Sequence, residues 1–171
     1  MRGTIKGPVV VLDAAGGIGH AVVQAAVDAQ RPVIAVSPDV ASLKQLKASC
    51  AGADLTLVRA SIADDSSSAA LAAALRKLNR PLAGIVIAIC PEPARGRALE
   101  QSTDVLRETL RDELLPHLAA ARALVPVLAE AGRNGRYVVI GGPGSEQPWA
   151  GYGHRSISAA ATRMLLRVLH D

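Results

Sequence analysis

A glycine-rich turn near the start of the chain carries the clearest chemical signal. It follows an apolar run at residues 8–12 and precedes a helix-like period. Glycines in such a turn let the backbone approach a pyrophosphate, and the helix that follows offers unpaired N–H groups and its positive end. The same glycines also suit tight packing of a strand on a helix without any ligand. Both interpretations stay open, and the candidate cofactor-binding residues here are Asp13, Ala14, Gly16, Gly17, Ile18 and Gly19.

Other reactive side chains form weaker patterns. The four histidines lack the spacing of zinc ligands and no Cys/His cluster forms, so no metal site is expected. Cys90 ends an apolar run near the expected crevice and is a candidate for cofactor contact, although a small core residue is favoured over a nucleophile. Asp64 and Asp65 fit a solvated loop before a helix. Glu92 and Glu113 could enter the crevice, but the sequence gives them no pairing geometry.

Five short apolar runs alternate with longer stretches of helical period. The predicted strands are residues 8–12, 32–36, 54–58, 84–90 and 136–141. Strands separated by helices imply right-handed crossovers and therefore a parallel sheet between two helix layers. We predict a three-layer α/β fold of the doubly wound, Rossmann-like type, a single domain over residues 1–171, with strand order 3-2-1-4-5. Its ligand crevice would lie at the carboxyl ends of the strands, where the order reverses.

The second half of the chain holds the longest predicted helices. Residues 98–131 have a helical period, and Pro116 predicts a break there, with a second helix capped by Asp112. The last helix carries an apolar face, formed by Ile157, Ala160, Ala161, Met164, Leu165 and Val168.

Composition narrows the class of protein. The chain has 171 residues, half of them apolar and 20% charged, which suits one folded domain and excludes a disordered chain. No apolar stretch reaches the roughly 18 residues that a membrane span needs. Two cysteines cannot form a disulfide framework, which favours a reducing cytoplasm.

The net charge of +4 does not indicate a nucleic-acid partner. Lysine and arginine are scattered singly among acidic residues, and only 2% of residues are aromatic, so neither a basic patch nor a base-stacking surface is expected. A basic surface in solvent is the simpler interpretation.

Three motifs resemble the short-chain dehydrogenase/reductase family. The run at residues 17–19 matches the second half of the family's Thr-Gly-x-x-x-Gly-Ile-Gly turn, and residues 122–126 match a stretch of the helix before the fifth strand. Residues 138–140 precede a glycine-rich loop, and Tyr152 opens a helix as the family's catalytic tyrosine does. The resemblance spans essentially the whole chain. It implies NAD(P) as cofactor and a small carbonyl compound as substrate.

The departures from the family lie where its chemistry would be. The first glycine of the turn falls on Asp13, whose carboxylate would repel a diphosphate. The catalytic serine falls on Ile140 or Gly141, and the lysine on Ser156. The helix asparagine falls on Glu113. The aspartate that contacts adenine falls on Ser61, and the Asn-Asn-Ala-Gly that ends the fourth strand falls on residues 87–90, which are apolar or cysteine.

Tyr152 is the one catalytic residue of the family that this sequence keeps. An isolated tyrosine has a pKa of about 10 and is a poor acid or base at neutral pH. Arg155, three residues on, lies on the same part of the helix and could lower that pKa, although arginine cannot relay a proton. The alternative for Tyr152 is a packing role at the helix start. At the end of the second strand Ser37 is the candidate for ribose contact, with Asp39 slightly late for it.

Three functions remain open at this stage. We favour a homologue with weak or absent dinucleotide binding and no efficient hydride transfer. The alternatives are an active NAD(P)-dependent reductase that uses Tyr152 and Arg155, and a structural subunit of a hetero-oligomer. The resemblance also implies a homodimer through the last two long helices. Because relatives continue for two further strands, we expect the substrate lid to be missing and the edge beyond the fifth strand to be open or covered by a partner.

Overall fold

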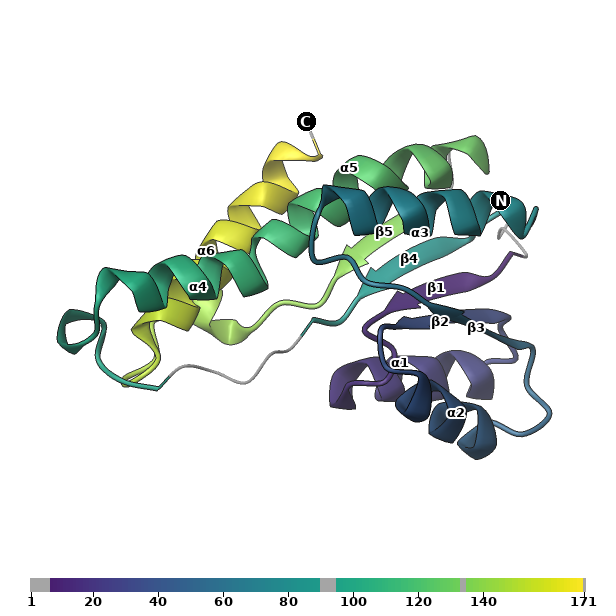
Figure 1. The fold of residues 1–171 in the computed structure, drawn as a ribbon, viewed down its shortest axis with the longest axis horizontal. Helices are drawn as coiled ribbons and strands as arrows, with labels where there is room; N and C mark the ends of the chain where they lie inside the picture. The colour runs from purple at the N-terminus through teal and green to yellow at the C-terminus, as the bar shows by residue number, and fades with distance from the viewer. Residues whose placement is uncertain (1–6, 90–94, 133–134, 171) are drawn as a thin grey trace.

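One parallel sheet organises the molecule (Figure 1), a computed structural model that describes residues 7–89, 95–132 and 135–170. Its strand order is β3-β2-β1-β4-β5. The strands are β1 (Val9–Leu12), β2 (Val33–Ser37), β3 (Leu55–Arg59), β4 (Gly84–Ile87) and β5 (Arg136–Val139). The predicted order and the parallel direction are confirmed. The order reverses between β1 and β4, which places a crevice at their carboxyl ends.

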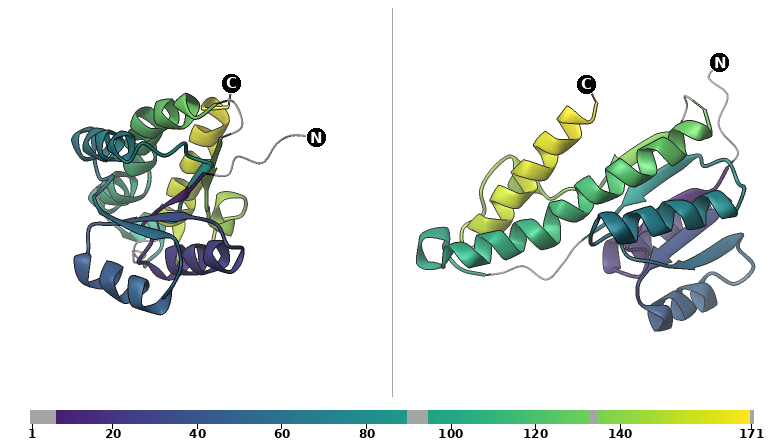
Figure 2. Two further views of the ribbon diagram at one scale, coloured as in Figure 1. Left: turned by 90° about the vertical axis from the view of Figure 1, so that its right-hand side faces the viewer. Right: turned by 45° about the horizontal axis from the view of Figure 1, so that its top comes forward.

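Helices cover both faces of the sheet, as Figures 1 and 2 show. One face packs on α1 (Gly17–Asp28) and α2 (Val40–Ser49) through a core that includes Val11, Val23 and Leu46. The other face packs on α3 (Asp65–Lys77) and α5 (Leu115–Glu130), with a core that includes Ile85, Leu71 and Leu124. Strands covered on both sides are apolar at successive positions rather than at alternate ones, which explains the continuous runs in the sequence.

Pro116 divides the long helical stretch at the predicted place. α4 (Thr103–Glu113) ends there and α5 begins, with Leu114 at the boundary. Proline suits the first turn of α5, where its missing N–H has no partner to lose. The prediction that Asp112 caps the second helix is wrong. Asp112 lies inside α4, and its Oδ1 accepts a hydrogen bond from Nε of Arg111 at 2.9 Å.

The apolar face of α6 (Gly153–Val168) points outward. Ile157 is 46% exposed, Met164 55% and Val168 63%, whereas the buried side chains of this helix are polar. They are His154, Ser156, Ser158 and Thr162. The reason is tertiary: α6 packs against α4 and the short 3-10 helix η2 (Pro143–Ser145), at the far end of the molecule from α2 (Figure 1).

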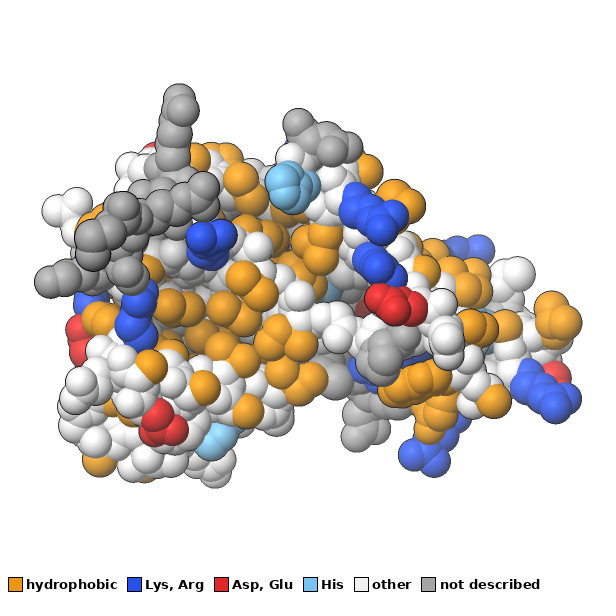
Figure 3. All heavy atoms as spheres, turned by 180° about the vertical axis from the view of Figure 1, so that it is seen from behind, with side chains coloured by type: hydrophobic (Ala, Val, Ile, Leu, Met, Phe, Trp, Pro, Cys, Tyr) orange, Lys and Arg blue, Asp and Glu red, His pale blue; other side chains and the backbone are white. Residues whose placement is uncertain are grey.

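The sheet face on the side of α1 is incompletely covered near β5. Tyr137 and Val139 pack toward α3 and α5, so Val138, which alternates with them, faces the opposite side and is 45% exposed. Figure 3 shows apolar side chains gathered across the middle of the back of the molecule. No helix in the described part of the chain is both long and apolar enough to cross a membrane.

Candidate functional site

The turn between β1 and α1 keeps the tight backbone course that the sequence predicts. Asp13 adopts a left-handed conformation with φ of 58°, and its carbonyl accepts a hydrogen bond from the Gly16 N–H at 3.1 Å. A Cβ at Gly19 would lie 2.0 Å from that same carbonyl oxygen, so only glycine fits there. Ala14 is fully buried, and its N–H donates to the Val36 carbonyl at 3.0 Å. Gly19 therefore serves close packing whether or not a ligand binds.

The carboxylate of Asp13 lies over the start of α1. A Cβ built on Gly16 would be 3.0 Å from Oδ2 of Asp13, and Gly16 is the N-cap of α1 with no side-chain cap of its own. The positive end of a helix attracts anions. In this protein the Asp13 carboxylate itself places a negative charge near the N-terminus of α1. A crevice of about 240 Å³ opens beside Asp13, and Pro38, Ser61 and Pro116 contribute to its wall.

The residues expected to contact the ribose are engaged in local structure. Ser37 is buried, and its hydroxyl accepts a hydrogen bond from the Asp39 N–H at 3.2 Å. Asp39 caps α2, accepting hydrogen bonds from the N–H groups of Ala41 and Ser42. Hydrogen bonds from the Ser42 hydroxyl and the Ala41 N–H hold the pKa of Asp39 below its usual value. Cys90 and Glu92 lie outside the described residues.

A second, larger cleft of about 880 Å³ lies beside α6. Its wall combines the end of β5 and the loop after it with α6, η2 and the facing residues of α4 and α5. Tyr152 and Arg155, the two candidate catalytic residues, both line it, and Ile18 joins the wall from the start of α1. The structure thus brings one residue of the glycine turn and both catalytic candidates to a common cleft.

Tyr152 stands at the N-terminal boundary of α6. Its ring meets that of Trp149 edge to face, with centroids 6.3 Å apart and an interplanar angle of 77°. Ser156, where the sequence resemblance places the family's lysine, donates its hydroxyl proton to the Tyr152 carbonyl at 3.2 Å and accepts from the Trp149 N–H at 3.1 Å. Ser156 therefore holds the loop onto the helix and offers no charge to the tyrosine.

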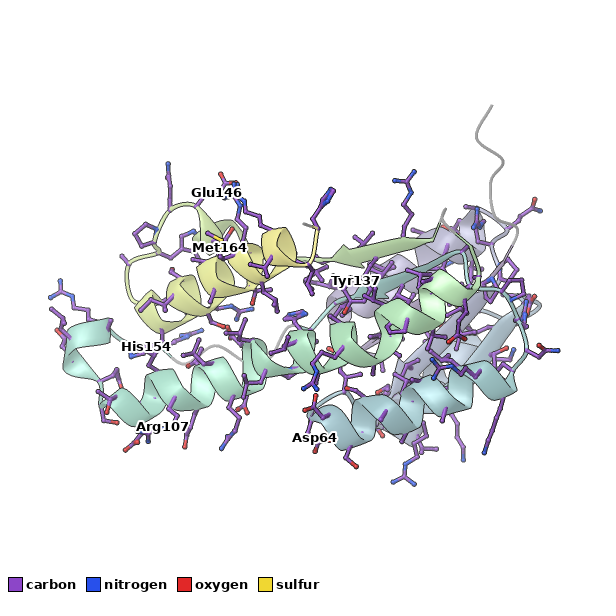
Figure 4. The ribbon with its side chains drawn as sticks, turned by 90° about the horizontal axis from the view of Figure 1, so that it is seen from above. Asp64, Arg107, Tyr137, Glu146, His154 and Met164 are labelled. Atoms are coloured by element: carbon purple, nitrogen blue, oxygen red, sulfur yellow. The ribbon has the colours of Figure 1, made fainter. Side chains whose placement is uncertain are left out.

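Glu113 and Arg155 face each other inside the cleft. Oε1 of Glu113 lies 4.0 Å from Nε of Arg155, with side-chain exposures of 13% and 27%. Burial raises the pKa of Glu113, and the Ser158 hydroxyl and the Arg155 charge oppose that rise. A second ion pair joins Arg163 on α6 to Glu146 at 2.9 Å. Glu146, labelled in Figure 4, lies on the loop that leads to α6. The charged side chains that line the cleft are thus arranged in pairs of opposite sign.

His117 is a polar residue of the cleft that sequence reasoning missed. It lies in the first turn of α5, is 6% exposed and lines the cleft. No described residue forms a hydrogen bond with its buried Nδ1. Burial lowers its pKa to about 4, so the imidazole is neutral near pH 7. Spacing contained a hint: His117 follows Glu113 by four residues, one helical turn.

Within the described ranges, no group of three or more His, Cys, Asp or Glu side chains could hold a metal ion.

Comparison with known proteins adds a family and a fold. A family model described as Enoyl-(Acyl carrier protein) reductase matches residues 14–170. A short chain oxidoreductase from Pseudomonas aeruginosa PAO1, described as NADPH-bound and containing an atypical catalytic center, is 21% identical with a TM-score of 0.84. The comparison covers 96% of this chain and 65% of that one.

Two further solved structures resemble the chain to a similar degree. A short-chain dehydrogenase from Streptomyces avermitilis is 24% identical with a TM-score of 0.81, covering 95% of this chain and 59% of that one. L-Sorbose reductase from Gluconobacter frateurii, complexed with NADPH and L-sorbose, is 17% identical with a TM-score of 0.84, covering 95% and 62%. The chain therefore spans about three fifths of the length of these relatives. A search of curated proteins found no match.

Proposed function

The chain belongs to the short-chain dehydrogenase/reductase family, and we propose that it keeps the family's scaffold while binding dinucleotides weakly and transferring hydride inefficiently. It would then act as a non-catalytic homologue of the family's oxidoreductases.

The carboxylate of Asp13 carries this proposal. It lies over Gly16 at the N-terminus of α1, where the phosphates of a dinucleotide would rest in this fold. Two negative charges about 4 Å apart repel by about 1 kcal/mol in water and by several times that near a protein surface. The Asp13 carboxylate also interacts with the positive N-terminus of α1, which a cofactor phosphate would otherwise use. Both effects weaken the binding of NAD(P), the cofactor that we assign to the scaffold.

The cleft beside α6 supports the second half of the proposal. Tyr152 has Ser156 where the family's lysine would stand, and the hydroxyl of Ser156 is engaged with the backbone. The positive charge of Arg155 is partly balanced by the Glu113 carboxylate, whose Oε1 lies 4.0 Å from Nε of Arg155. A guanidinium, moreover, does not release a proton in proteins. Proton relay and carbonyl polarisation each contribute about 10²-fold or more in rate, so losing both leaves little catalysis.

Titration with NADPH and NADH tests the proposal. Wild-type protein should bind either nucleotide only weakly, as followed by nucleotide fluorescence and thermal shift. Asp13→Asn tolerates the left-handed backbone and removes the charge, and Asp13→Gly removes the side chain as well. Both variants should bind NADPH at least about tenfold more tightly, a difference of about 1.4 kcal/mol. Tyr152→Phe should leave any residual carbonyl reduction nearly unchanged.

The opposite result would identify an active reductase. Tight NADPH binding by the wild type, with carbonyl reduction that Tyr152→Phe abolishes, would overturn the proposal. Arg155 would then be the cation that replaces the family's lysine.

We also propose a cytoplasmic homodimer. The exposed apolar residues of α6 are accompanied by Leu115, Leu118 and Val125 on α5, which are 49%, 38% and 39% exposed. Two helices with outward apolar residues can bury them against the same helices of a second copy. A monomer at tens of micromolar, as measured by light scattering, would reject the dimer.

A further inference from the structure

The smaller crevice, beside Asp13, has the lining of a ligand site. Its volume is about 240 Å³, and it lies at the carboxyl ends of β1, β2 and β3, the edge of a doubly wound sheet at which ligands bind. Of the ten described residues that line it, eight are apolar, which suits a compact hydrocarbon body. The other two are Asp13 and Ser61, so the described wall carries one formal charge, and that charge is negative.

Helices α1, α2 and α3 each begin at this edge beside an aspartate. The Asp13 carboxylate lies over the N-terminus of α1, the Asp39 side chain caps α2, and the Asp64 side chain caps α3 (Figure 4). The Ser42 hydroxyl lowers the pKa of Asp39. The Ser67 N–H lowers the pKa of Asp64, so both carboxylates are ionised near pH 7. Each of these helix starts therefore has a negative charge from the chain itself beside it.

The charges at this edge add up to a negative potential. A helix N-terminus is equivalent to about half a positive charge, whereas an ionised carboxylate carries a whole negative one. Two of the lining residues, Pro38 and Ala63, are the sequence neighbours of Asp39 and Asp64, so these aspartates adjoin the crevice. No lysine or arginine stands among its described lining residues. The crevice therefore repels an anion and attracts a cation.

The Asp13 carboxylate is a suitable partner for an ammonium group. A carboxylate can accept about four hydrogen bonds, so Asp13 can accept one from a ligand and keep its contacts within the protein. Hydrogen bonds between ionised groups are about twice as strong as neutral ones. A polyhydroxylated ligand, by contrast, finds few polar partners in this wall.

We propose that this crevice binds a small organic ammonium ion, with Asp13 as its counter-ion and the apolar wall around its hydrocarbon body. The inference rests on the proposed function only in sharing Asp13, since the charge that repels a cofactor phosphate is the one that attracts an amine. Binding needs neither a nucleotide nor hydride transfer.

Three probes separate the contributions of charge and hydrocarbon body. Benzylamine, which is charged at neutral pH, should bind nucleotide-free protein saturably with a Kd of about 1 mM, as expected for about eight heavy atoms. Benzyl alcohol has the ring without the charge, and ethylamine has the charge without the ring. Each should bind at least about tenfold more weakly, as measured by ligand-observed saturation-transfer NMR. Added salt should weaken the binding of benzylamine more than that of benzyl alcohol.

Substitution of Asp13 tests the counter-ion itself. Asp13→Asn keeps the shape of the side chain and removes its charge, so it should raise the Kd for benzylamine at least about tenfold and leave that for benzyl alcohol unchanged. Asparagine tolerates the left-handed conformation of this position, and Asp13→Gly is a second variant that does so. Asp28→Asn is the matched control, because it makes the same change at the exposed far end of α1. It should leave the Kd for benzylamine unchanged.

Any of three results would rule out amine recognition by Asp13. They are no saturable binding of benzylamine, equal affinity for benzylamine and benzyl alcohol, and equal affinity of the wild type and Asp13→Asn for benzylamine. The two proposals fail separately. Tight NADPH binding by a wild type that also binds benzylamine through Asp13 would remove the proposed function alone. Weak NADPH binding without any benzylamine binding would remove the amine site alone.

Discussion

The turn between β1 and α1 and the cleft beside α6 are held in place by different kinds of contact. In the turn the backbone course is kept, with Asp13 in the left-handed region and its carbonyl packed against Gly19, and one added carboxylate changes the chemistry. In the cleft the chemistry comes from several side chains. Glu113 and Ser156 stand where the sequence resemblance places the family's asparagine and lysine, and His117 adds a buried imidazole.

The difference shows that backbone shape fixes one region of this molecule and side-chain chemistry the other. The turn is constrained by sterics, since main-chain atoms of Asp13 and Ala14 fill the space beside Gly19. The cleft is governed by burial and ionisation, since its polar groups are paired or neutral. The folding stability of the turn should therefore respond mainly to added volume, and that of the cleft mainly to pH and to charge.

The largest effect should come from adding one methyl group to the turn. Gly19→Ala would place Cβ 2.0 Å from the Asp13 carbonyl oxygen, a backbone atom that cannot rotate away. We expect a loss of about 3 kcal/mol or more in the free energy of unfolding, measured by urea denaturation. Gly17→Ala is the matched control, because nothing lies within 4 Å of its Cβ position. It should be neutral or slightly stabilising. Equal losses in the two variants would contradict the steric account.

Acidification should lower the free energy of unfolding through His117 by about as much as Gly19→Ala does. The folded pKa of His117 is about 4 against 6.5 for the free side chain, so the unfolded chain takes up the proton first as the pH falls. The stability that neutral, buried His117 contributes is fully present above pH 6.5 and is lost as the pH falls toward about 4. At about 1.36 kcal/mol per pKa unit, the loss amounts to about 3 kcal/mol.

The contribution of His117 must be separated from that of its neighbours. Burial raises the pKa of Glu113, with Ser158 and Arg155 opposing, so Glu113 contributes with the opposite sign, favouring the folded state at low pH. Urea denaturation at several pH values between 7.5 and 4.5 should therefore compare the wild type with His117→Leu. The leucine variant should lose less stability over this interval. Identical pH profiles would show that His117 is not the group that titrates.

The smallest effect on stability should come from the outward face of α6. Met164 is 55% exposed, so Met164→Glu should change the free energy of unfolding by no more than about 0.5 kcal/mol. The same change should dissociate the proposed dimer, as measured by sedimentation equilibrium. Leu99→Glu is the control, since Leu99 is fully exposed and belongs to η1 (Ala98–Glu100) rather than to α5 or α6. If Met164→Glu leaves the dimer intact, the interface lies elsewhere.

The sequence by itself determined the sheet, its strand order and the break at Pro116. Alternation of short apolar runs with helical periods is a local property of the chain, and right-handed crossovers then leave few possible orders. It also located Tyr152 at the start of a helix, because the resemblance in that segment is one of order and spacing.

Only the tertiary structure decided which face of α6 is buried and which groups meet in the cleft. Periodicity identifies an apolar face, but the segments packed against a helix decide whether that face is covered, and here α4 and η2 cover the polar one. Glu113 and Arg155 are separated by 42 positions and come together only because α4 packs on α6. The burial that makes His117 neutral likewise comes from several elements at once, so no local pattern in the sequence contains it.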